Sequence, residues 1–574
     1  MTAPEGKRRI GVYVCHCGGN ISDYVDCEQV REAIAGEPSV EVAKTTMFAC
    51  SDATQQEIID DIQGRELDGI VVASCSPTLH LSTFRGVAER AGLNPYQYIQ
   101  VNLREQCSWA HTDLPGLATE KAVAMVKAGV AKARYTEPLE KTRIETVPRV
   151  LVVGAGITGL RAALALSDLG IAVYVAEQQD QPGGWVRGFG RMYPHDRQGS
   201  ELIGRLLADI ERRDNVTIYT SAELVEKSGS VGDFTVVLQV AGERVTLGVG
   251  AIIVATGFAA YEPQDGEYGR GAGSVVTLPE FKQLLDEGEG PLEHAGKPVR
   301  SVTYVYCVGA RCATDGHEYC SRYCCNAAIH ASMVAAERSP DLLQYHLYRD
   351  IRTYGKFEQL FHEARRDGSV FIKFSADDPP RVEQSNGGSR VTVKDVLTGN
   401  RELELETDLV VLITAMEPRS NPALSSVLKI PAGLDGFFKE IHPKLRPVET
   451  VIDGVFVAGA AQAPRNSAES AASALAAAAK SAALLKRGFV ELEPLIVTVD
   501  PDTCTWCDVC AAACPYEAIG RAPHGDKEVA VINEAICKGC GACVPVCPVG
   551  AIDLRGSTDL QIRAMIEAME VVHV

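Results

Sequence analysis

Thiol groups are the most concentrated chemistry in this chain of 574 residues, which contains 19 cysteines. Five of them lie in CVGARCATDGHEYCSRYCC, residues 307–325, directly after the apolar run SVTYVY. A cytosolic chain seldom keeps disulfides, so cysteines at this density are more often metal ligands or redox groups. The cysteines therefore predict metal or redox chemistry, and the folded elements must bring them together.

Residues 491–574 carry the most specific cysteine pattern. CTWCDVCAAACP and CKGCGACVPVCP each read C-x2-C-x2-C-x3-C-P, the two-cluster pattern of bacterial ferredoxins, in which the fourth cysteine of each run binds the other cluster. The spacing predicts one [4Fe-4S] cluster on Cys504, Cys507, Cys510 and Cys547. It predicts a second on Cys537, Cys540, Cys543 and Cys514. Structural or zinc-binding cysteines are the alternative, which the doubled motif with its two prolines disfavours.

A glycine-rich loop predicts a dinucleotide site in the middle of the chain. RVLVVGAGITGLRAALALSDLGIAVYVAE, residues 149–177, reads as a strand, a loop, a helix and a second strand. Gly154, Gly156 and Gly159 let the backbone approach a pyrophosphate at the helix N-terminus, and Glu177 is spaced to bond the adenosine ribose. The strand before, the helix after and the acid at the right distance complete the βαβ fingerprint.

Three further segments favour FAD over a nicotinamide cofactor at this loop. Paired glycines follow the acid, an Ala-Thr-Gly turn ends a later strand, and GVFVAGAAQAP, 454–464, precedes an alanine-rich helix. The residues predicted to contact FAD are Gly183, Gly184, Ala255, Thr256, Gly257, Gly459, Ala460 and Gln462. A packing motif without a cofactor would require all of these segments to agree by coincidence.

The insertion at about 259–450 is where a flavoprotein of this kind would place its pyridine-nucleotide domain. Its strand SVTYVY should lead into a second glycine-rich loop, but it leads into Cys307-Val-Gly-Ala-Arg-Cys312. No other strand in the insertion precedes a phosphate loop. We therefore expect a cluster where the nicotinamide would approach the flavin, and weak or no binding of NADH.

The N-terminal residues 1–145 are predicted to form a small parallel α/β domain. Four apolar runs end at or just before a cysteine, and the carboxyl ends of parallel strands share one edge of a sheet. One more [4Fe-4S] cluster is therefore predicted on Cys17 (or Cys15), Cys50, Cys75 and Cys107. The alternative is that these cysteines are small apolar residues of a core.

The order of these parts resembles that of the A subunit of heterodisulfide reductases, the HdrA-like iron–sulfur flavoproteins. The resemblance covers essentially the whole chain, and its most specific residues are Cys307, Cys320, Cys324 and Cys325, which match the spacing of the family's unusual cluster motif. It implies a [4Fe-4S] cluster on these four cysteines, with Cys312 as a spare. An additional internal ferredoxin, found in some family members, is absent from this sequence.

The resemblance also implies FAD-centred electron transfer and flavin-based bifurcation between a two-electron donor, a disulfide-type acceptor and ferredoxin. The implied partners are HdrB- and HdrC-like subunits, a hydrogenase, formate or NADH-oxidising module, and a second copy of the chain. A non-bifurcating relay protein, or an NAD(P)H-dependent oxidoreductase similar to the small subunit of glutamate synthase, remain alternatives.

One position departs from what the resemblance implies for bifurcating members. They often have a lysine five positions after the adjacent cysteine pair, where this chain has His330. An imidazole titrates near neutral pH, so His330 is expected to make the flavin potentials pH-sensitive. The alternative is that His330 faces away from the flavin.

Composition places these parts in a cytoplasmic α/β protein of about three domains. The fold expected is an N-terminal α/β domain, a thioredoxin-reductase-like FAD domain at 146–490 with a Rossmann βαβ unit, and a C-terminal ferredoxin domain. The net charge of -19 argues against nucleic acid and anionic membranes as main partners. The chain has no run of 18 apolar residues and no N-terminal signal segment.

Overall fold

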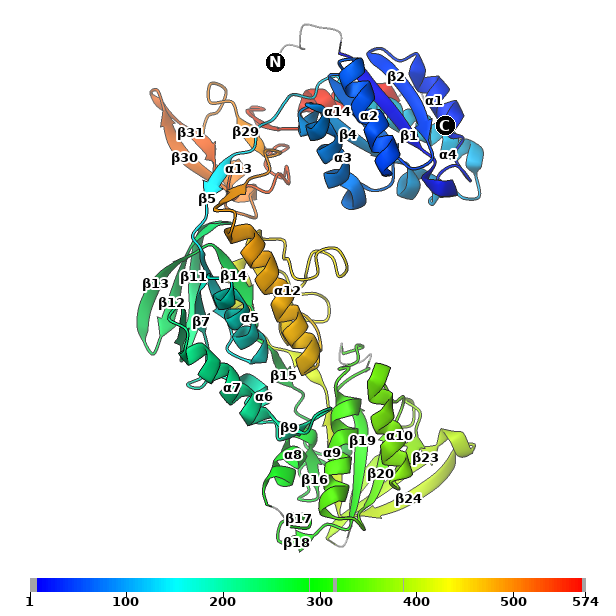
Figure 1. Cartoon of the computed structure of the whole chain (residues 1–574), viewed down its shortest axis with the longest axis vertical. Helices are drawn as coiled ribbons and strands as arrows, with labels where there is room; N and C mark the ends of the chain where they lie inside the picture. Colours follow the sequence, from blue (N-terminus) through cyan, green and yellow to red (C-terminus); the bar gives the residue numbers. More distant parts are fainter. Residues whose placement is uncertain (1–7, 289, 313–316, 386, 570–574) are drawn as a thin grey trace. The chain divides into compact units, whose positions relative to one another are not determined.

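The computed structural model describes residues 8–288, 290–312, 317–385 and 387–569 (Figure 1). The chain divides into two compact units, one formed by Met1–Arg143 with Glu491–Val574, and the other by Ile144–Val490. The fold class expected from the sequence is confirmed, since parallel α/β sheets and a two-cluster ferredoxin-type module both occur. Within the described ranges, no helix is long and apolar enough to cross a membrane.

The N-terminal part of the first unit is a four-stranded parallel sheet in the order β2-β1-β3-β4. The central strands β1 and β3 are buried along their whole length, as expected for parallel strands covered by helices on both faces. All four strands therefore end at one edge. The elements are β1 (Ile10–Cys15), α1 (Cys27–Ala35), β2 (Val40–Thr46), α2 (Asp52–Gly64), β3 (Gly69–Ser74), α3 (Pro77–Ala91), β4 (Tyr98–Asn102) and α4 (Pro115–Ala133).

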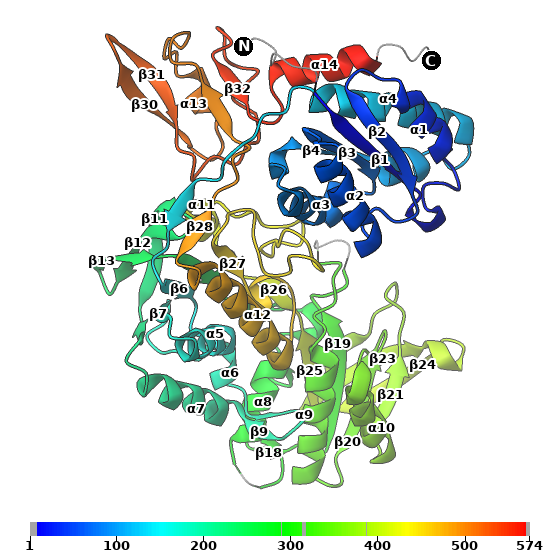
Figure 2. The same cartoon turned by 45° about the horizontal axis from the view of Figure 1, so that its top comes forward.

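The C-terminal part of the first unit is a small module of two-stranded sheets around the ferredoxin-type cysteine runs. Its elements are β29 (Val497–Val499), α13 (Val509–Ala513), β30 (Ile519–His524), β31 (Lys527–Ile532), β32 (Ile552–Leu554) and α14 (Asp559–Met569). Helix α14 packs along α4, as Figure 2 shows. Gln561 fixes this contact, because its buried side-chain amide donates a hydrogen bond of 2.9 Å to the Tyr135 carbonyl.

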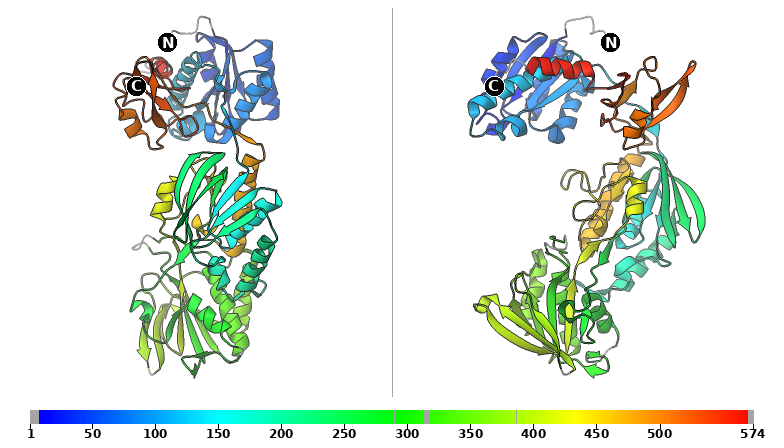
Figure 3. Two further views of the ribbon diagram at one scale, coloured as in Figure 1. Left: turned by 90° about the vertical axis from the view of Figure 1, so that its left-hand side faces the viewer. Right: turned by 180° about the vertical axis from the view of Figure 1, so that it is seen from behind.

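The second unit contains a five-stranded sheet in the order β10-β7-β6-β14-β27, with all strands parallel. Helix α5 packs against α12, which is almost all alanine and serine on its buried side, so the two helices approach closely (Figure 3). The elements are β6 (Arg149–Val153), α5 (Ile157–Asp168), β7 (Ala172–Ala176), α6 (Gly184–Arg187), α7 (Gly199–Glu211), β10 (Val216–Tyr219), β14 (Ala251–Val254), β27 (Val455–Val457) and α12 (Ser467–Leu485).

A second parallel sheet, in the order β16-β25-β19-β20-β21, is built from the inserted segment. The antiparallel pair β15 (Phe258–Ala260) and β26 (Met416–Pro418) lies where the chain enters and leaves this insertion. The elements are β16 (Val275–Thr277), α8 (Leu278–Asp286), β19 (Ser301–Val308), α9 (Cys324–Arg338), β20 (Leu343–Tyr348), α10 (Glu358–Arg366), β21 (Val370–Lys373) and β25 (Leu409–Thr414).

Two antiparallel three-stranded sheets complete the second unit. The first continues from the β10 strand and consists of β11 (Ala222–Ser230), β12 (Asp233–Val240) and β13 (Glu243–Val249). The second lies between β21 and β25 in the sequence and consists of β22 (Arg381–Ser385), β23 (Gly388–Asp395) and β24 (Arg401–Thr407).

Candidate functional site

The glycine-rich loop between β6 and α5 folds so tightly that two of its glycines accept no side chain. A Cβ on Gly159 would overlap the carbonyl of Gly154, and one on Gly154, where φ is 106°, would meet the Ala255 carbonyl. Gly156 is different, because a Cβ there would point into open space. Gly156 is also the N-cap of α5, whose first N–H groups point outward to a site suited to a pyrophosphate.

Glu177 ends β7 beside this loop and is almost fully buried. One carboxylate oxygen accepts a hydrogen bond of 2.7 Å from the Ala155 N–H, and the other accepts one of 3.0 Å from the Gln179 N–H. Glu177 therefore holds the loop to the neighbouring strand, and it also lines the adjoining cavity. Its bond to an adenosine ribose stays a prediction.

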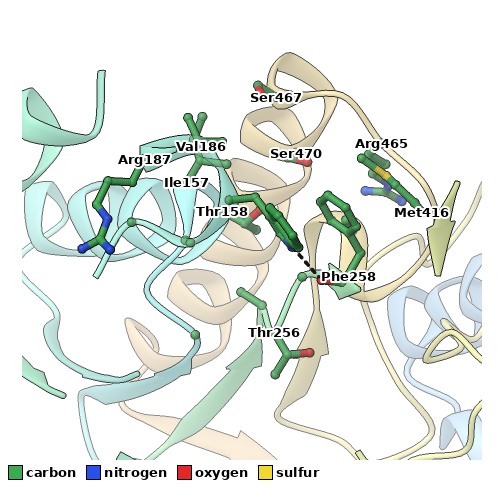
Figure 4. A pocket seen from close by; sticks show the side chains of 18 of the residues that line it. Ile157, Thr158, Val186, Arg187, Thr256, Phe258, Met416, Arg465, Ser467 and Ser470 are labelled. Atoms are coloured by element: carbon green, nitrogen blue, oxygen red, sulfur yellow. Dashed lines mark hydrogen bonds between the residues drawn. The ribbon is translucent and has the colours of Figure 1, made fainter. Parts of the chain in front are cut away.

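A cavity of about 790 Å³ runs from the glycine-rich loop to the second parallel sheet. This volume falls in the range of small-molecule and cofactor sites. Thr256, labelled in Figure 4, and Asn421 both line it. Thr256 Oγ1 and Asn421 Nδ2 are buried and have no hydrogen-bond partner among the described residues, and a bound cofactor would supply one. Of the residues predicted to contact FAD, the cavity is lined by Gly154, Gly156, Glu177, Gly183, Gly184, Ala255, Thr256, Gly257 and Ala460.

Trp185 forms a wall of this cavity that the sequence did not single out. Its ring stacks on Phe258 with the centroids 5.6 Å apart, and its Nε1 donates a hydrogen bond of 3.0 Å to the Phe258 carbonyl, drawn as the dashed line in Figure 4. Trp185 keeps 37% of its surface exposed, so a flat face of the indole remains for a ligand. An aromatic pair of this kind suits the planar ring system of a flavin.

The segment after β27 closes the cavity in part. Gly459 approaches α5 so closely that a Cβ would overlap Thr158 Oγ1, while Ala460 faces the cavity. The Gln462 side chain does not line the cavity. Its Nε2 donates hydrogen bonds to Glu440 and to the Pro447 carbonyl, each at 2.8 Å, and its Oε1 accepts one from Arg465. Gln462 therefore orients Arg465, which does line the cavity.

Four thiols gather where β19 ends and α9 begins. The Cys324 thiol donates a hydrogen bond to Cys325, which lowers the pKa of Cys325 and raises that of Cys324. The neighbouring thiols of Cys307 and Cys320 raise the pKa of Cys324 further. These four are the cysteines that the family resemblance implies as cluster ligands, and the residues 313–316 between them lie outside the described residues.

Arginines surround this group of thiols, and two of them restrain it. The Arg349 guanidinium donates to the carbonyls of Cys307, Ala310 and Arg311 at 3.4, 2.7 and 3.0 Å, so it fixes the loop after β19. Arg311 pairs with Asp350 at 2.7 Å. The positive charges of Arg349 and Arg311 also act to lower the pKa of Cys307, against the larger effect of burial, and so favour a thiolate ligand.

The same loop is covered by an aromatic side chain. A Cβ on Gly309 would overlap the ring of Tyr261, which therefore packs on the loop. The Tyr261 hydroxyl donates a hydrogen bond of 2.8 Å to Glu267 and so keeps the ring in place. Weak or absent binding of NADH at this position stays a prediction.

Helix α9 connects the four thiols to the cavity. It begins at Cys324, and Ala327 and His330, one and two turns on, line the cavity. His330 Nε2 forms a contact of 2.7 Å with Asp196 Oδ1, and its ring lies 6.2 Å from that of Tyr193. Burial lowers the pKa of His330 despite the Asp196 carboxylate. His330 therefore lies on the cavity wall, while its role at the flavin stays a prediction.

The second predicted group of ferredoxin-type cysteines lies together, and so do three cysteines of the first, while the place of Cys547 in that first group stays a prediction. A small cavity is lined by Cys514 together with Cys537, Cys540 and Cys543. Burial raises the pKa of Cys510, and the thiols of Cys507 and Cys504 add to the shift. Backbone N–H groups point at several sulfurs, at 3.3 Å for Cys514 and Cys547 and 3.4 Å for Cys504, and such bonds stabilise thiolate ligands.

The N-terminal cysteines meet at the carboxyl edge of the sheet, but not in the set expected. Burial raises the pKa of Cys15 to about 11, and the nearby thiols of Cys17 and Cys50 add to that shift. Burial also raises the pKa of Cys75, where Cys17 adds to the shift and Arg104 opposes it. Cys15 Sγ accepts hydrogen bonds of 3.3 Å from the N–H groups of Cys17 and Ala49.

Cys107 points away from this edge. The turn 104–108 after β4 directs its side chain inward, where its sulfur lies 3.3 Å from Met125 Sδ of α4 and is fully buried. Among the described residues, no interaction joins Cys107 to another cysteine. The group at the sheet edge is therefore Cys15, Cys17, Cys50 and Cys75, with Cys15 in the place expected for Cys107.

Across the described part of the chain, no three His, Cys, Asp or Glu side chains are close enough to hold a single metal ion.

Two family descriptions match parts of the chain. A 4Fe-4S dicluster domain matches residues 503–551, and an NAD(P)-binding Rossmann-like domain matches residues 152–200. An iron–sulfur A subunit of the CoB–CoM heterodisulfide reductase of Methanopyrus kandleri is 34% identical, over 90% of this chain and 91% of its own length. The chain belongs to the HdrA family, the A subunits of heterodisulfide reductases.

Another HdrA protein is similar over the same extent. The A subunit of the H2:CoB-CoM heterodisulfide,ferredoxin reductase of Methanothermobacter thermautotrophicus is 34% identical, over 91% of this chain and 92% of its own. Among solved structures, thioredoxin reductase from T. acidophilum matches 59% of this chain and 99% of its own, with a TM-score of 0.40 and 17% identity. As a member of the HdrA family, the chain is an oxidoreductase component that transfers electrons with FAD and iron–sulfur clusters.

Proposed function

We propose that this HdrA-family chain is the electron-distributing hub of a heterodisulfide-reductase-type complex, and that it bifurcates electron pairs at FAD. The observation that carries the proposal is the course of α9, which begins at the four thiols of 307–325 and lines the flavin cavity two turns later. FAD, when bound, exchanges electrons singly or in pairs. A cluster on Cys307, Cys320, Cys324 and Cys325 exchanges them singly.

The cavity residues divide into groups with different tasks. The Gly154–Gly159 loop and Glu177 bind the nucleotide end of FAD, and Trp185 and Phe258 position its ring system. Thr256 and Asn421 offer the ligand their unpartnered polar atoms. His330 holds a proton in its contact with Asp196, on the wall nearest the 307–325 cysteines.

Direct hydride transfer from a nicotinamide nucleotide is the weaker alternative. Tyr261 covers Gly309, and Arg349 bonds to the carbonyls of the loop after β19, which disfavours a phosphate at this position. We therefore assign the entry of electrons to the cysteine groups. The two ferredoxin-type clusters and an N-terminal cluster on Cys15, Cys17, Cys50 and Cys75 provide routes to partners.

The names of relatives indicate the class of partner. One relative is named as a ferredoxin reductase and another as ferredoxin- and F420H2-dependent. For this chain we propose ferredoxin, HdrB- and HdrC-like subunits and a hydrogenase, formate or NADH-oxidising module, around a homodimer of the chain in the cytoplasm.

Coupling between the two acceptors tests bifurcation. The complex is isolated from native extract under anoxic conditions, its two-electron donor is supplied, and ferredoxin reduction is followed with and without the disulfide-type acceptor. Bifurcation predicts that ferredoxin reduction falls to background when that acceptor is omitted. Equal rates in both cases would show a relay without bifurcation.

A further inference from the structure

Lys282 places a positive charge on the wall of the flavin cavity. It lies on α8, and with Leu278 and Pro279 it forms the face of that helix that lines the cavity. Its Nζ donates one hydrogen bond of 2.8 Å, to the carbonyl of Arg191. Among the described residues, no carboxylate lies within ion-pair distance of this ammonium group.

Two of the nearby carboxylates pair with other cations. Asp196 pairs with Arg191 at 3.2 Å and with His330 at 2.7 Å, and Glu337 also pairs with Arg191. Asp286, one turn after Lys282 on α8, accepts a hydrogen bond from the backbone of Arg191, and burial raises its pKa although the charge of Lys282 opposes the shift. Lys282 therefore has the charge of Asp286 nearby but no ion-pair contact among the described residues.

A half-buried ammonium group without an ion-pair contact costs free energy, which a binding site can recover when an anion arrives. Burial lowers the pKa of Lys282, as this cost requires, although Asp286 opposes the shift. Burial, assisted by the charges of Lys282 and Arg191, also lowers the pKa of His330. Lys282 is the basic side chain that α8 contributes to this wall of the cavity.

The position of Lys282 indicates which part of the ligand it meets. The nucleotide end of the cavity is the Gly154–Gly159 loop on the first parallel sheet, whereas α8 and α9 belong to the second. If the α5 N-terminus held the diphosphate of FAD, the other end of the cavity, lined by residues of α8 and α9, would hold the isoalloxazine end. Lys282 would then face the group that becomes anionic on reduction.

We propose that Lys282 is an anion-binding residue of the flavin site, whose ammonium group compensates for negative charge on the isoalloxazine ring. This inference rests on the proposed function, because it requires FAD in the cavity. It assigns the cation that favours the reduced flavin to α8, outside the cysteine-bearing helix. His330 lies on the same wall and contacts Asp196.

Lys282→Met removes the charge and keeps the length of the side chain, and Lys282→Arg is the matched control that keeps the charge. The probe is sulfite, which adds to oxidised flavin and leaves a negative charge on the ring, read as a difference spectrum of the FAD-loaded full chain. We expect Lys282→Met to weaken sulfite binding by about tenfold or more, and Lys282→Arg to change it by about threefold at most.

The flavin-free protein gives an independent readout. Lys282→Met should raise the thermal midpoint of the flavin-free, cluster-loaded chain, because it removes a half-buried charge without an ion-pair contact, and the gain should disappear once FAD is bound. Equal sulfite affinities of wild type and Lys282→Met would overturn the role of Lys282 alone. Failure of the wild-type chain to bind FAD would overturn the proposed function and this inference together.

Discussion

Cys324 and Cys325 lie at the start of the helix that connects the four-thiol group to the flavin cavity. They begin α9 as members of a four-thiol group, and the same helix then lines the flavin cavity. The resemblance to the HdrA family implied this group, because the four positions match the family's cluster motif. The arginines around it could not be predicted, since Arg349 comes from the end of a different strand, β20.

Cys325→Ala should remove one cluster and leave FAD bound. The thiolate is a ligand, while the flavin cavity is built from other segments, so anaerobic preparations should lose about four irons per chain and keep their flavin. Cys312→Ala is the matched control and should keep the full iron content. A Cys325→Ala protein with unchanged iron and unchanged spectra would show that these cysteines are structural.

At the scale of the element, Gly159 and Gly156 of the glycine-rich loop are expected to matter for different reasons, one for stability and the other for binding of FAD. Gly159→Ala should destabilise the flavin-free protein by roughly 3 kcal/mol, because the new Cβ meets the Gly154 carbonyl, which cannot move aside. Gly156→Ala should leave that stability unchanged, since its Cβ enters open space, and should weaken FAD binding by occupying the pyrophosphate position. Thermal midpoints and FAD affinities of the two variants check this, and equal destabilisation by both would contradict it.

The second parallel sheet contains a buried histidine that should make stability depend on pH. His346 of β20 is stacked between Tyr304 and Phe371, and burial lowers its pKa to about 3. The unfolded chain takes up this proton below pH about 6.5, whereas the folded chain does not, so stability present above that pH is lost as the pH falls toward 3.

His346→Phe should therefore flatten the decrease of the thermal midpoint between pH about 6.5 and about 4. Replacement of the exposed His362 of α10 by phenylalanine is the matched control and should leave the slope unchanged. If both variants showed the same dependence of the thermal midpoint on pH as the wild type, His346 would not be the cause of the loss of stability in acid.

The elements also show where prediction from the sequence stops. The strand–loop–helix around Gly154 and the paired cysteine runs are local patterns, and their ligand groups follow from spacing. Trp185 follows the paired glycines without being part of their pattern, and Lys282 reaches the cavity from a segment without a motif. Only the packing of the folded elements brings them to one cavity. Cys107 was expected at the sheet edge because β4 ends near it, but the turn 104–108 directs it into the core.

At the scale of the whole molecule, the described residues combine four cysteine groups with a flavin cavity. Two groups lie in the ferredoxin-type module, one at the end of β19, and one at the edge of the N-terminal sheet. This arrangement favours a protein that distributes single electrons over one that transfers hydride to a bound nucleotide. The central claim is therefore the number of clusters that serve one FAD.

Anaerobic measurement of iron and FAD in the purified full chain tests this claim most directly. Four clusters of four irons predict roughly sixteen irons per FAD. A value near twelve would show that either the cluster at 307–325 or the N-terminal cluster is absent. The Cys325→Ala protein would show which, because it loses iron only if the cluster at 307–325 exists. A value near eight would contradict the account, because only the ferredoxin-type clusters would remain and the cysteines at the start of α9 would hold none.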